Sequence, residues 1–293
     1  MTGKAPFQKQ LYWQMLAQAL WVKSDIEGRR AQNAWGTITW QFNEIWPTGG
    51  WGSIEYGTTG FTPGQVEGGR WKPLQYFMRR FLYRDHLIAA SSDGRVLIKS
   101  DDAFAPVAGA TASLRMLHLA SGAITPAATW PVALPRGGGA SMWGCADGRS
   151  AAGACTQWPA LLPTLGCAAD GSDCIALLEL RSASGGLLAD NFELLTAPYR
   201  MAFPAAAQVS AAVASAPNGD GSVNITLSAD STALFVTLTT AAAGRFSDNA
   251  VILTPGASTV AFIPWGALDL GLLASSLRVE HVAMHGVNAS RVN

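Results

Sequence analysis

The chain has 293 residues, of which 49% are hydrophobic, 14% are charged and 31 are glycines, a composition typical of a folded protein rather than a disordered one. Its 20 basic and 20 acidic side chains balance, and residues 1–84 carry only ten Lys and Arg against five Asp and Glu, which argues against nucleic-acid binding. The apolar runs end well short of the roughly 20 residues that span a bilayer, so no membrane association is expected.

The first predicted element is a helix over residues 11–30. Leu11, Met15, Ala19 and Val22 recur at helical spacing and predict a single apolar stripe. The residues before this helix contain no hydrophobic run typical of a signal peptide, so any signal peptide is expected upstream of this sequence.

The second predicted element is a strand over residues 36–47. Ile38, Trp40 and Phe42 alternate with polar residues, which is the period of a strand. Pro47 is expected to end the strand because proline has no N–H for the ladder.

A Gly-rich loop over residues 48–57 then leads to a predicted helix over residues 70–82, in which apolar side chains again recur at helical spacing. A helix, a strand, a loop and a second helix, with aromatic side chains at the carboxyl end of the strand, are typical of a (β/α) barrel. Since a complete barrel takes about 250 residues and eight strands, residues 1–86 are predicted to be only a part of one.

The composition of the sequence changes near His86. An aromatic-rich segment ends there, and short runs of alternating apolar and polar residues follow, separated by turn signals. A second boundary is predicted near Ala205. The block that follows contains a series of short predicted strands, which is typical of a β-sandwich.

Four blocks carry a family resemblance: residues 40–47, 51–57, 70–77, and 243–255 with 262–265. The first three look like the last barrel strand and helix of the β-mannosidases of glycoside hydrolase family 2, and the fourth is similar to the signature of their C-terminal Ig-like domain. The family usually has Asp at the position of Glu44.

The resemblance implies a mainly β fold class, with the last β/α elements of a (β/α)8 barrel followed by two Ig-like β-sandwich domains. The predicted domains are residues 1–86, the incomplete C-terminal end of the catalytic barrel; residues 87–205, a β-sandwich with a Cys-rich insertion; and residues 206–293, the C-terminal Ig-like β-sandwich.

The resemblance also implies a substrate site. Trp40 is expected to lie under the sugar in the subsite next to the cleaved bond, although a core tryptophan that closes the barrel is the alternative. Asn43 and Glu44 either bind sugar hydroxyls or brace the loop. Trp46 and Trp51 either form a subsite wall or pack beneath the loop.

The implied activity is that of a retaining exo-β-mannosidase, a glycosidase that hydrolyses terminal β-D-mannose residues of oligosaccharides or glycoproteins. Such an enzyme needs two carboxyl groups about 5–5.5 Å apart, and in this family both are glutamates on earlier barrel strands. Neither motif is present here, so no catalytic residue is assigned and this chain is expected to be a C-terminal part. The alternative is a non-catalytic β-sandwich protein that binds carbohydrate or a partner.

The four cysteines lie close together in the sequence. Their spacing lacks the Cys-x2-Cys pairs of zinc sites, which favours disulfides over a metal site, with free thiols as a further alternative. The simplest pairing joins nearest neighbours, Cys145 with Cys155 and Cys167 with Cys174. The four histidines are scattered and are predicted to be ordinary surface or core residues; no metal or cofactor is predicted.

Two triplets, starting at Asn224 and Asn288, fit the acceptor pattern for N-glycosylation. Together with the disulfides and the family resemblance, they predict a lysosomal or secreted glycoprotein.

Overall fold

The structure is a computed structural model that describes residues 3–34, 36–44, 50–55, 69–91, 94–144, 149–150, 153–154, 157–204 and 207–286. The chain separates into two compact units. Unit 1 comprises residues 1–29, 35–78 and 204–293, and unit 2 comprises residues 30–34 and 79–203. Most of the N-terminal segment therefore groups with the C-terminal residues, whereas the predicted three-domain division stays a prediction.

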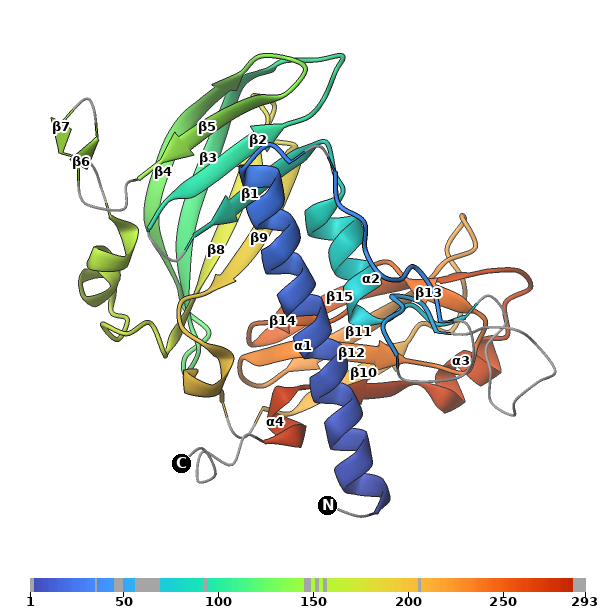
Figure 1. Cartoon of the computed structure of the whole chain (residues 1–293). Coiled ribbons are helices and arrows are strands. Elements are labelled where there is room, and N and C mark those ends of the chain that lie inside the picture. The colour runs from blue at the N-terminus through green and yellow to red at the C-terminus, as the bar shows by residue number, and fades with distance from the viewer. Residues whose placement is uncertain are drawn as a thin grey trace. The chain divides into compact units, whose positions relative to one another are not determined.

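The helices and strands follow one another along the chain, and most of them are labelled in Figure 1. They are α1 (Lys4–Ala31), α2 (Pro73–Phe77), the π-helix η1 (Met78–Leu82), β1 (His86–Ala90), β2 (Val96–Ser100), β3 (Val107–His118), β4 (Ile124–Leu134), β5 (Gly139–Trp143), β6 (Arg149–Ser150), β7 (Gly153–Ala154), the 3-10 helix η2 (Trp158–Leu165), β8 (Cys174–Arg181), β9 (Leu187–Leu194), the 3-10 helix η3 (Pro198–Arg200), β10 (Val209–Val213), β11 (Val223–Ala229), β12 (Ala233–Thr239), β13 (Gly244–Phe246), β14 (Val251–Leu253), β15 (Gly256–Pro264), α3 (Leu270–Ser276), β16 (Arg278–Glu280) and α4 (Val282–His285).

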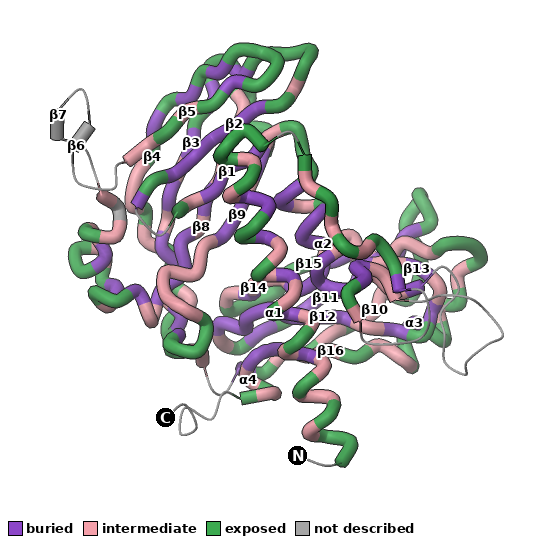
Figure 2. The backbone as a smooth tube through the Cα atoms, viewed as in Figure 1, coloured by how far each residue is buried: buried purple, intermediate pink, exposed green. Residues whose placement is uncertain are grey.

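Unit 2 is a β-sandwich. Its strands form a three-stranded sheet in the order β1-β2-β5 and a four-stranded sheet in the order β4-β3-β8-β9. Ile98 of β2, Leu114 of β3 and Leu178 of β8 are buried in one core, so both sheets contribute to it. Figure 2 shows the buried stretches along β3 and β8.

Unit 1 contains a second β-sandwich, with sheets in the orders β10-β11-β15-β13 and β14-β12-β16. Along β11, Val223, Ile225 and Leu227 are buried whereas Asn224 and Thr226 are exposed, which is the alternation of a strand with one face on a core. The predicted mainly β fold with β-sandwich sheets is thus confirmed.

Helix α1 forms as predicted but is longer, and its buried face differs from the predicted stripe. The buried residues are Tyr12, Leu16, Ala19, Lys23, Ile26 and Glu27. Leu11, Met15 and Val22 lie at the edges of this face and are half-buried. The prediction was wrong because long polar side chains can be buried when they are paired: Lys23 and Glu27 form an ion pair at 3.0 Å.

Helix α1 is joined to the C-terminal sandwich of unit 1 by polar and aromatic contacts. The Tyr12 hydroxyl donates to the Phe235 carbonyl at 2.9 Å, and the Tyr12 ring stacks on His285 with ring centres 4.5 Å apart. Lys9 Nζ donates to the Gly286 carbonyl at 2.6 Å.

None of the helices in the described residues combines the length and apolarity needed to cross a membrane.

The strand predicted over residues 36–47 is not found in residues 36–44, and the rest of that range lies outside the described residues. Asn43 forms one isolated bridge to Ile54. Ile38, Trp40 and Phe42 are exposed, so their alternation does not cover a core. An alternating pattern forms a strand only where a neighbouring strand can pair with it and a core can cover its apolar face. The prediction that residues 1–86 are the end of a barrel is therefore not confirmed.

The helix predicted over residues 70–82 is present as α2 followed by η1. Pro73 begins it, as suits a first helical position that needs no N–H. Leu74, Phe77 and Phe81 are buried, as their spacing predicted.

The pH dependence of stability is expected to reflect His281. This residue is 3% exposed, and its Nδ1 has no hydrogen-bond partner among the described residues. Burial lowers its pKa from the ordinary value of 6.5, the neighbouring His285 lowers it further and Asp230 opposes the shift. A depressed pKa contributes stability above pH 6.5 that is lost as the pH falls from 6.5 through the folded-state value.

We therefore expect the chain to lose stability on acidification below about pH 6.5, and His281→Leu, which cannot be protonated, to flatten that loss. Urea denaturation at a series of pH values measures both slopes, with His86→Leu in unit 2 as the control. Parallel pH profiles for the parent and His281→Leu would contradict the assignment.

Candidate functional site

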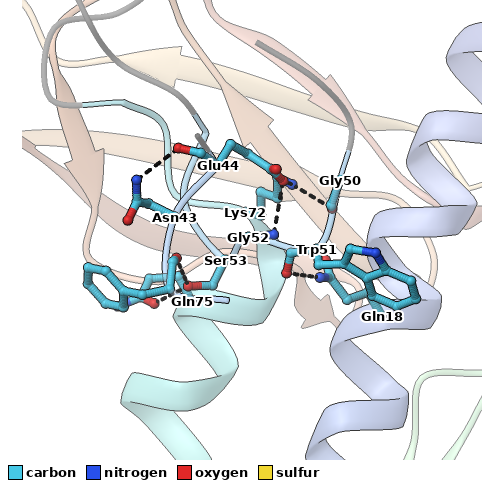
Figure 3. Close-up of polar contacts among 10 residues, drawn as sticks. Gln18, Asn43, Glu44, Gly50, Trp51, Gly52, Ser53, Lys72 and Gln75 are labelled. Atoms are coloured by element: carbon cyan, nitrogen blue, oxygen red, sulfur yellow. Dashed lines mark hydrogen bonds and ion pairs between the residues drawn. The ribbon is translucent and has the colours of Figure 1, made fainter. Parts of the chain in front are cut away.

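The candidate site is built from three short segments of unit 1 that lie side by side: residues 41–44, 50–55 and 70–75 (Figure 3). The first and second are joined by the bridge between Asn43 and Ile54, and the second and third by the bridge between Ile54 and Trp71. Glu44 N donates to the Ile54 carbonyl at 3.0 Å, and Lys72 N donates to the Ser53 carbonyl at 2.9 Å. The segment that the sequence predicted as a strand end is therefore held by isolated bridges.

Gly52 permits the close approach of the first two segments. A Cβ atom at this position would lie 2.5 Å from the backbone N of Glu44 and 2.6 Å from the carbonyl carbon of Asn43. Because both atoms belong to the backbone, a side chain here would force the segments apart.

A buried ion pair joins all three segments. The side chains of Lys72 and Glu44 are 5% and 2% exposed, and the Lys72 ammonium contacts Glu44 Oε1. The same carboxylate oxygen accepts from Gly52 N at 3.0 Å, and Lys72 Nζ also donates to the Gly50 carbonyl at 3.2 Å. Buried charges are stable only when paired and hydrogen-bonded, so the pair and its backbone partners form one unit.

The predicted site residues thus fall into different environments. Glu44 braces the loop through its ion pair, and the Asn43 side chain donates to the Glu44 carbonyl at 2.8 Å. Trp46 lies outside the described residues. For Asn43 and Glu44, the structure shows the bracing contacts; a role in sugar binding stays a prediction.

Two of the predicted tryptophans are exposed. Trp40 is 75% exposed and Trp51 is 64% exposed. Gln18 of α1 donates from its side chain to the Trp51 carbonyl at 2.6 Å, so the backbone that carries this indole is held to α1 (Figure 3). The peptide bond between Trp40 and Gln41 is cis.

Trp71 packs against the core of the C-terminal sandwich. The Arg245 guanidinium lies over its ring, 5.0 Å from the ring centre, and 5.8 Å from the centre of the Trp265 ring. The Tyr76 hydroxyl accepts from Phe246 N at 3.1 Å, and burial raises the pKa of Tyr76 to about 12. Sequence reasoning missed these partners, because they lie about 170 residues away along the chain.

The cysteine prediction is confirmed where it can be tested. Cys167 and Cys174 form a disulfide, with an S–S distance of 2.11 Å, whereas Cys145 and Cys155 lie outside the described residues. The structure also brings His118 to this disulfide, with Nδ1 3.5 Å from Cys174 Sγ. No local sequence pattern predicts this contact, because it depends on the pairing of β3 with β8.

Of the two predicted glycosylation positions, Asn224 is exposed on β11, and Asn288 lies outside the described residues. Modification of either residue stays a prediction.

Removing either charge of the buried pair is expected to destabilise unit 1. Glu44→Gln leaves the Lys72 ammonium buried without its counter-charge, which costs about 3–5 kcal/mol. Glu55→Gln is the matched control, because the pair of Glu55 with Arg70 is partly exposed and contributes about 0–1 kcal/mol. Urea denaturation measures both losses.

The double variant Glu44→Gln/Lys72→Met is expected to lose less stability than the two single variants together, because the pair is removed as a unit. Equal losses from Glu44→Gln and Glu55→Gln would show that burial does not strengthen the first pair.

Comparison with known proteins identifies the C-terminal sandwich. Residues 205–284 match the Ig_mannosidase family, described as an Ig-fold domain. A stretch of 84 residues is 37% identical to β-mannosidase from Capra hircus and covers 26% of this chain and 8% of that protein. A stretch of the same length is 33% identical to β-mannosidase from Bos taurus.

Solved structures share the fold over most of the chain. The β-D-mannosidase from Dictyoglomus thermophilum matches with a TM-score of 0.62 at 18% identity, covering 92% of this chain and 29% of that one. The exo-chitosanase from Amycolatopsis orientalis matches with a TM-score of 0.58 at 16% identity, covering 91% of this chain and 33% of that one. These identities establish the fold alone, and the chain spans about a third or less of each protein it matches.

The resemblance to the C-terminal portion of the β-mannosidases of glycoside hydrolase family 2 is thus confirmed, and residues 205–284 match the Ig-fold domain of the Ig_mannosidase family.

Proposed function

We propose that this chain is the C-terminal part of a retaining exo-β-mannosidase that removes terminal β-D-mannose residues from oligosaccharides or glycoproteins. The observation that carries the proposal is the match of residues 205–284 to the Ig_mannosidase family. The 37% identity to a β-mannosidase over 84 residues supports it. A lysosomal or secreted location and a β-mannoside partner belong to the same proposal.

The glutamates of the described N-terminal residues are held in ion pairs, which favours a structural role for them over a catalytic one. Glu27 pairs with Lys23, Glu44 with Lys72 and Glu55 with Arg70. A retaining glycosidase needs one carboxyl group that is protonated and a second one about 5–5.5 Å away. Each of these three carboxylates is already engaged by a cationic side chain, so in this proposal the acid and the nucleophile come from other residues of the enzyme.

The contribution of this chain to the substrate site is then an aromatic platform. Trp40 is exposed, and an exposed indole offers an apolar face against which the C–H face of a pyranose can lie. Ile38 and Phe42 are also exposed, and a contiguous patch of exposed apolar side chains would mark a binding surface. In this proposal, Trp40 binds the sugar while the Glu44–Lys72 pair keeps its loop in place.

The same exposed residues favour a second candidate function, a non-catalytic carbohydrate- or partner-binding protein. Under that alternative the platform binds ligand without any hydrolytic partner. Hydrolysis by the natural protein that contains this chain separates the two functions.

The platform is tested by titrating the ¹⁵N-labelled chain with β-1,4-mannobiose while following the indole N–H resonances. We expect the Trp40 resonance to shift at millimolar sugar and Trp40→Ala to weaken binding about tenfold, equivalent to 1.4 kcal/mol. Trp21→Ala is the matched control, since Trp21 is another exposed indole of unit 1, on α1. Equal effects of the two variants, or no shift at Trp40, would contradict the platform.

The second expectation is that the purified chain does not hydrolyse p-nitrophenyl β-D-mannoside, because the carboxylates named above are engaged by cations. Released p-nitrophenol is the measurement, with a complete β-mannosidase as the positive control. Turnover by the purified chain would place the catalytic groups here and overturn the assignment.

A further inference from the structure

Three potential metal ligands meet at one end of the four-stranded sheet of unit 2. His118 is the last residue of β3 and Cys174 is the first residue of β8, and the two are direct partners in the antiparallel register. Cys167 lies just after η2, and its Cα is 5.9 Å from that of Cys174. One ligand atom from each residue lies within 4.8 Å of the others.

The spacing of the donor atoms fits a tetrahedral zinc ion. His118 Nδ1 lies 3.5 Å from Cys174 Sγ. Zinc bonds of about 2.3 Å to sulfur and about 2.0–2.1 Å to nitrogen, at a tetrahedral angle, place the two donor atoms about 3.5–3.6 Å apart. This nitrogen and this sulfur already have the separation that such a site requires.

The imidazole is oriented for this role by its other nitrogen. His118 Nε2 lies 2.8 Å from the Thr125 hydroxyl. With Nε2–H donating to that hydroxyl, the lone pair of Nδ1 faces the sulfur atoms. Metal-binding histidines characteristically have such a partner on the second ring nitrogen, since it fixes both tautomer and ring orientation.

The loop that carries the two cysteines is held by hydrogen bonds that do not involve sulfur. Cys167 N donates to the Leu162 carbonyl at 2.9 Å, and Leu119 N donates to the Asp173 carbonyl at 2.9 Å. The Asp173 carboxylate accepts from Ala168 N at 2.7 Å. These bonds do not depend on the disulfide, so reduction is expected to leave both sulfurs beside His118, at the roughly 3.8 Å separation of a zinc dithiolate.

We propose that reduction of the Cys167–Cys174 disulfide converts this cluster into a Zn²⁺ site, with two thiolates and His118 Nδ1 as protein ligands and water in the fourth position. A dithiol supplies the two electrons and two protons: the S–S bond breaks, two thiols form, and the dithiol closes its own disulfide. Zinc binding then displaces both thiol protons. The site is independent of the proposed glycosidase function.

The same two sulfurs cannot form a disulfide and bind zinc together, so zinc binding reports the redox state of unit 2. In an oxidising compartment the disulfide closes the loop. Under reducing conditions the metal takes over that cross-link, and it joins the loop to the end of β3 as well.

The test uses the full chain with Cys145 and Cys155 replaced by serine, so that any thiolate signal comes from the described pair. The protein is reduced with dithiothreitol, freed of it without air, and titrated with Co²⁺ and then Zn²⁺. We expect one Co²⁺ per reduced chain, with the visible bands of a tetrahedral site and thiolate charge-transfer absorption, displacement by Zn²⁺, and no such spectrum for the oxidised chain.

Single substitutions then distinguish a site with three protein ligands from metal binding by the two cysteine thiolates alone. His118→Ala removes a ligand and is expected to weaken Co²⁺ binding at least tenfold, and Thr125→Val, which leaves all three ligands, about tenfold. His86→Ala is the matched control, because His86 is another half-buried histidine of unit 2 with a serine hydroxyl partner. Unchanged affinity in His118→Ala would overturn the proposal.

Circular dichroism shows whether the reduced, metal-free chain is folded. A folded spectrum that persists, or one lost on reduction and restored by Zn²⁺ but not by Mg²⁺, supports the site. A reduced chain that binds no Co²⁺, or that stays unfolded in the presence of Zn²⁺, overturns it.

Discussion

The buried ion pair between Glu44 and Lys72 organises the part of the chain that carries the exposed aromatic side chains. Its carboxylate accepts from Gly52 N and its ammonium contacts the Gly50 carbonyl, so one pair of charges joins three segments that no regular sheet holds together. Desolvating two charges is costly, and the backbone hydrogen bonds offset part of that cost. Trp40 lies four residues before Glu44, in a segment that no regular strand holds.

The remainder of unit 1 shows how an N-terminal segment without a complete sheet of its own is still buried. Tyr12 reaches the backbone of β12 and stacks on His285, and Tyr76 belongs to the core of the C-terminal sandwich. Aromatic side chains with a polar tip suit this task, since the ring fills the core while the hydroxyl satisfies a backbone group. Tyr12 and Tyr76 thus attach this segment to the C-terminal sandwich, while Phe7 and Trp21 of α1 stay exposed.

Unit 2 combines a β-sandwich core with a chemically distinct end. The same antiparallel register that aligns the core residues of β3 and β8 also sets His118 opposite Cys174. The packing of the core and the proposed ligand set thus depend on the same pairing of β3 with β8. A shift of one residue in that pairing would move His118 to the other face of the sheet. This placement makes the inferred zinc site a property of the sandwich, separate from the aromatic segment of unit 1.

The sequence by itself determined the mainly β character, helix α1, the buried apolar face of the second helix at Phe77 and Phe81, and the family of residues 205–284, because these follow from local period and motif. It also predicted the Cys167–Cys174 disulfide. Only the tertiary structure decided that residues 36–44 form no strand, that Glu44 is held by Lys72, and that His118 meets the disulfide. Each of these depends on which distant segment supplies the partner, and local pattern carries no such information.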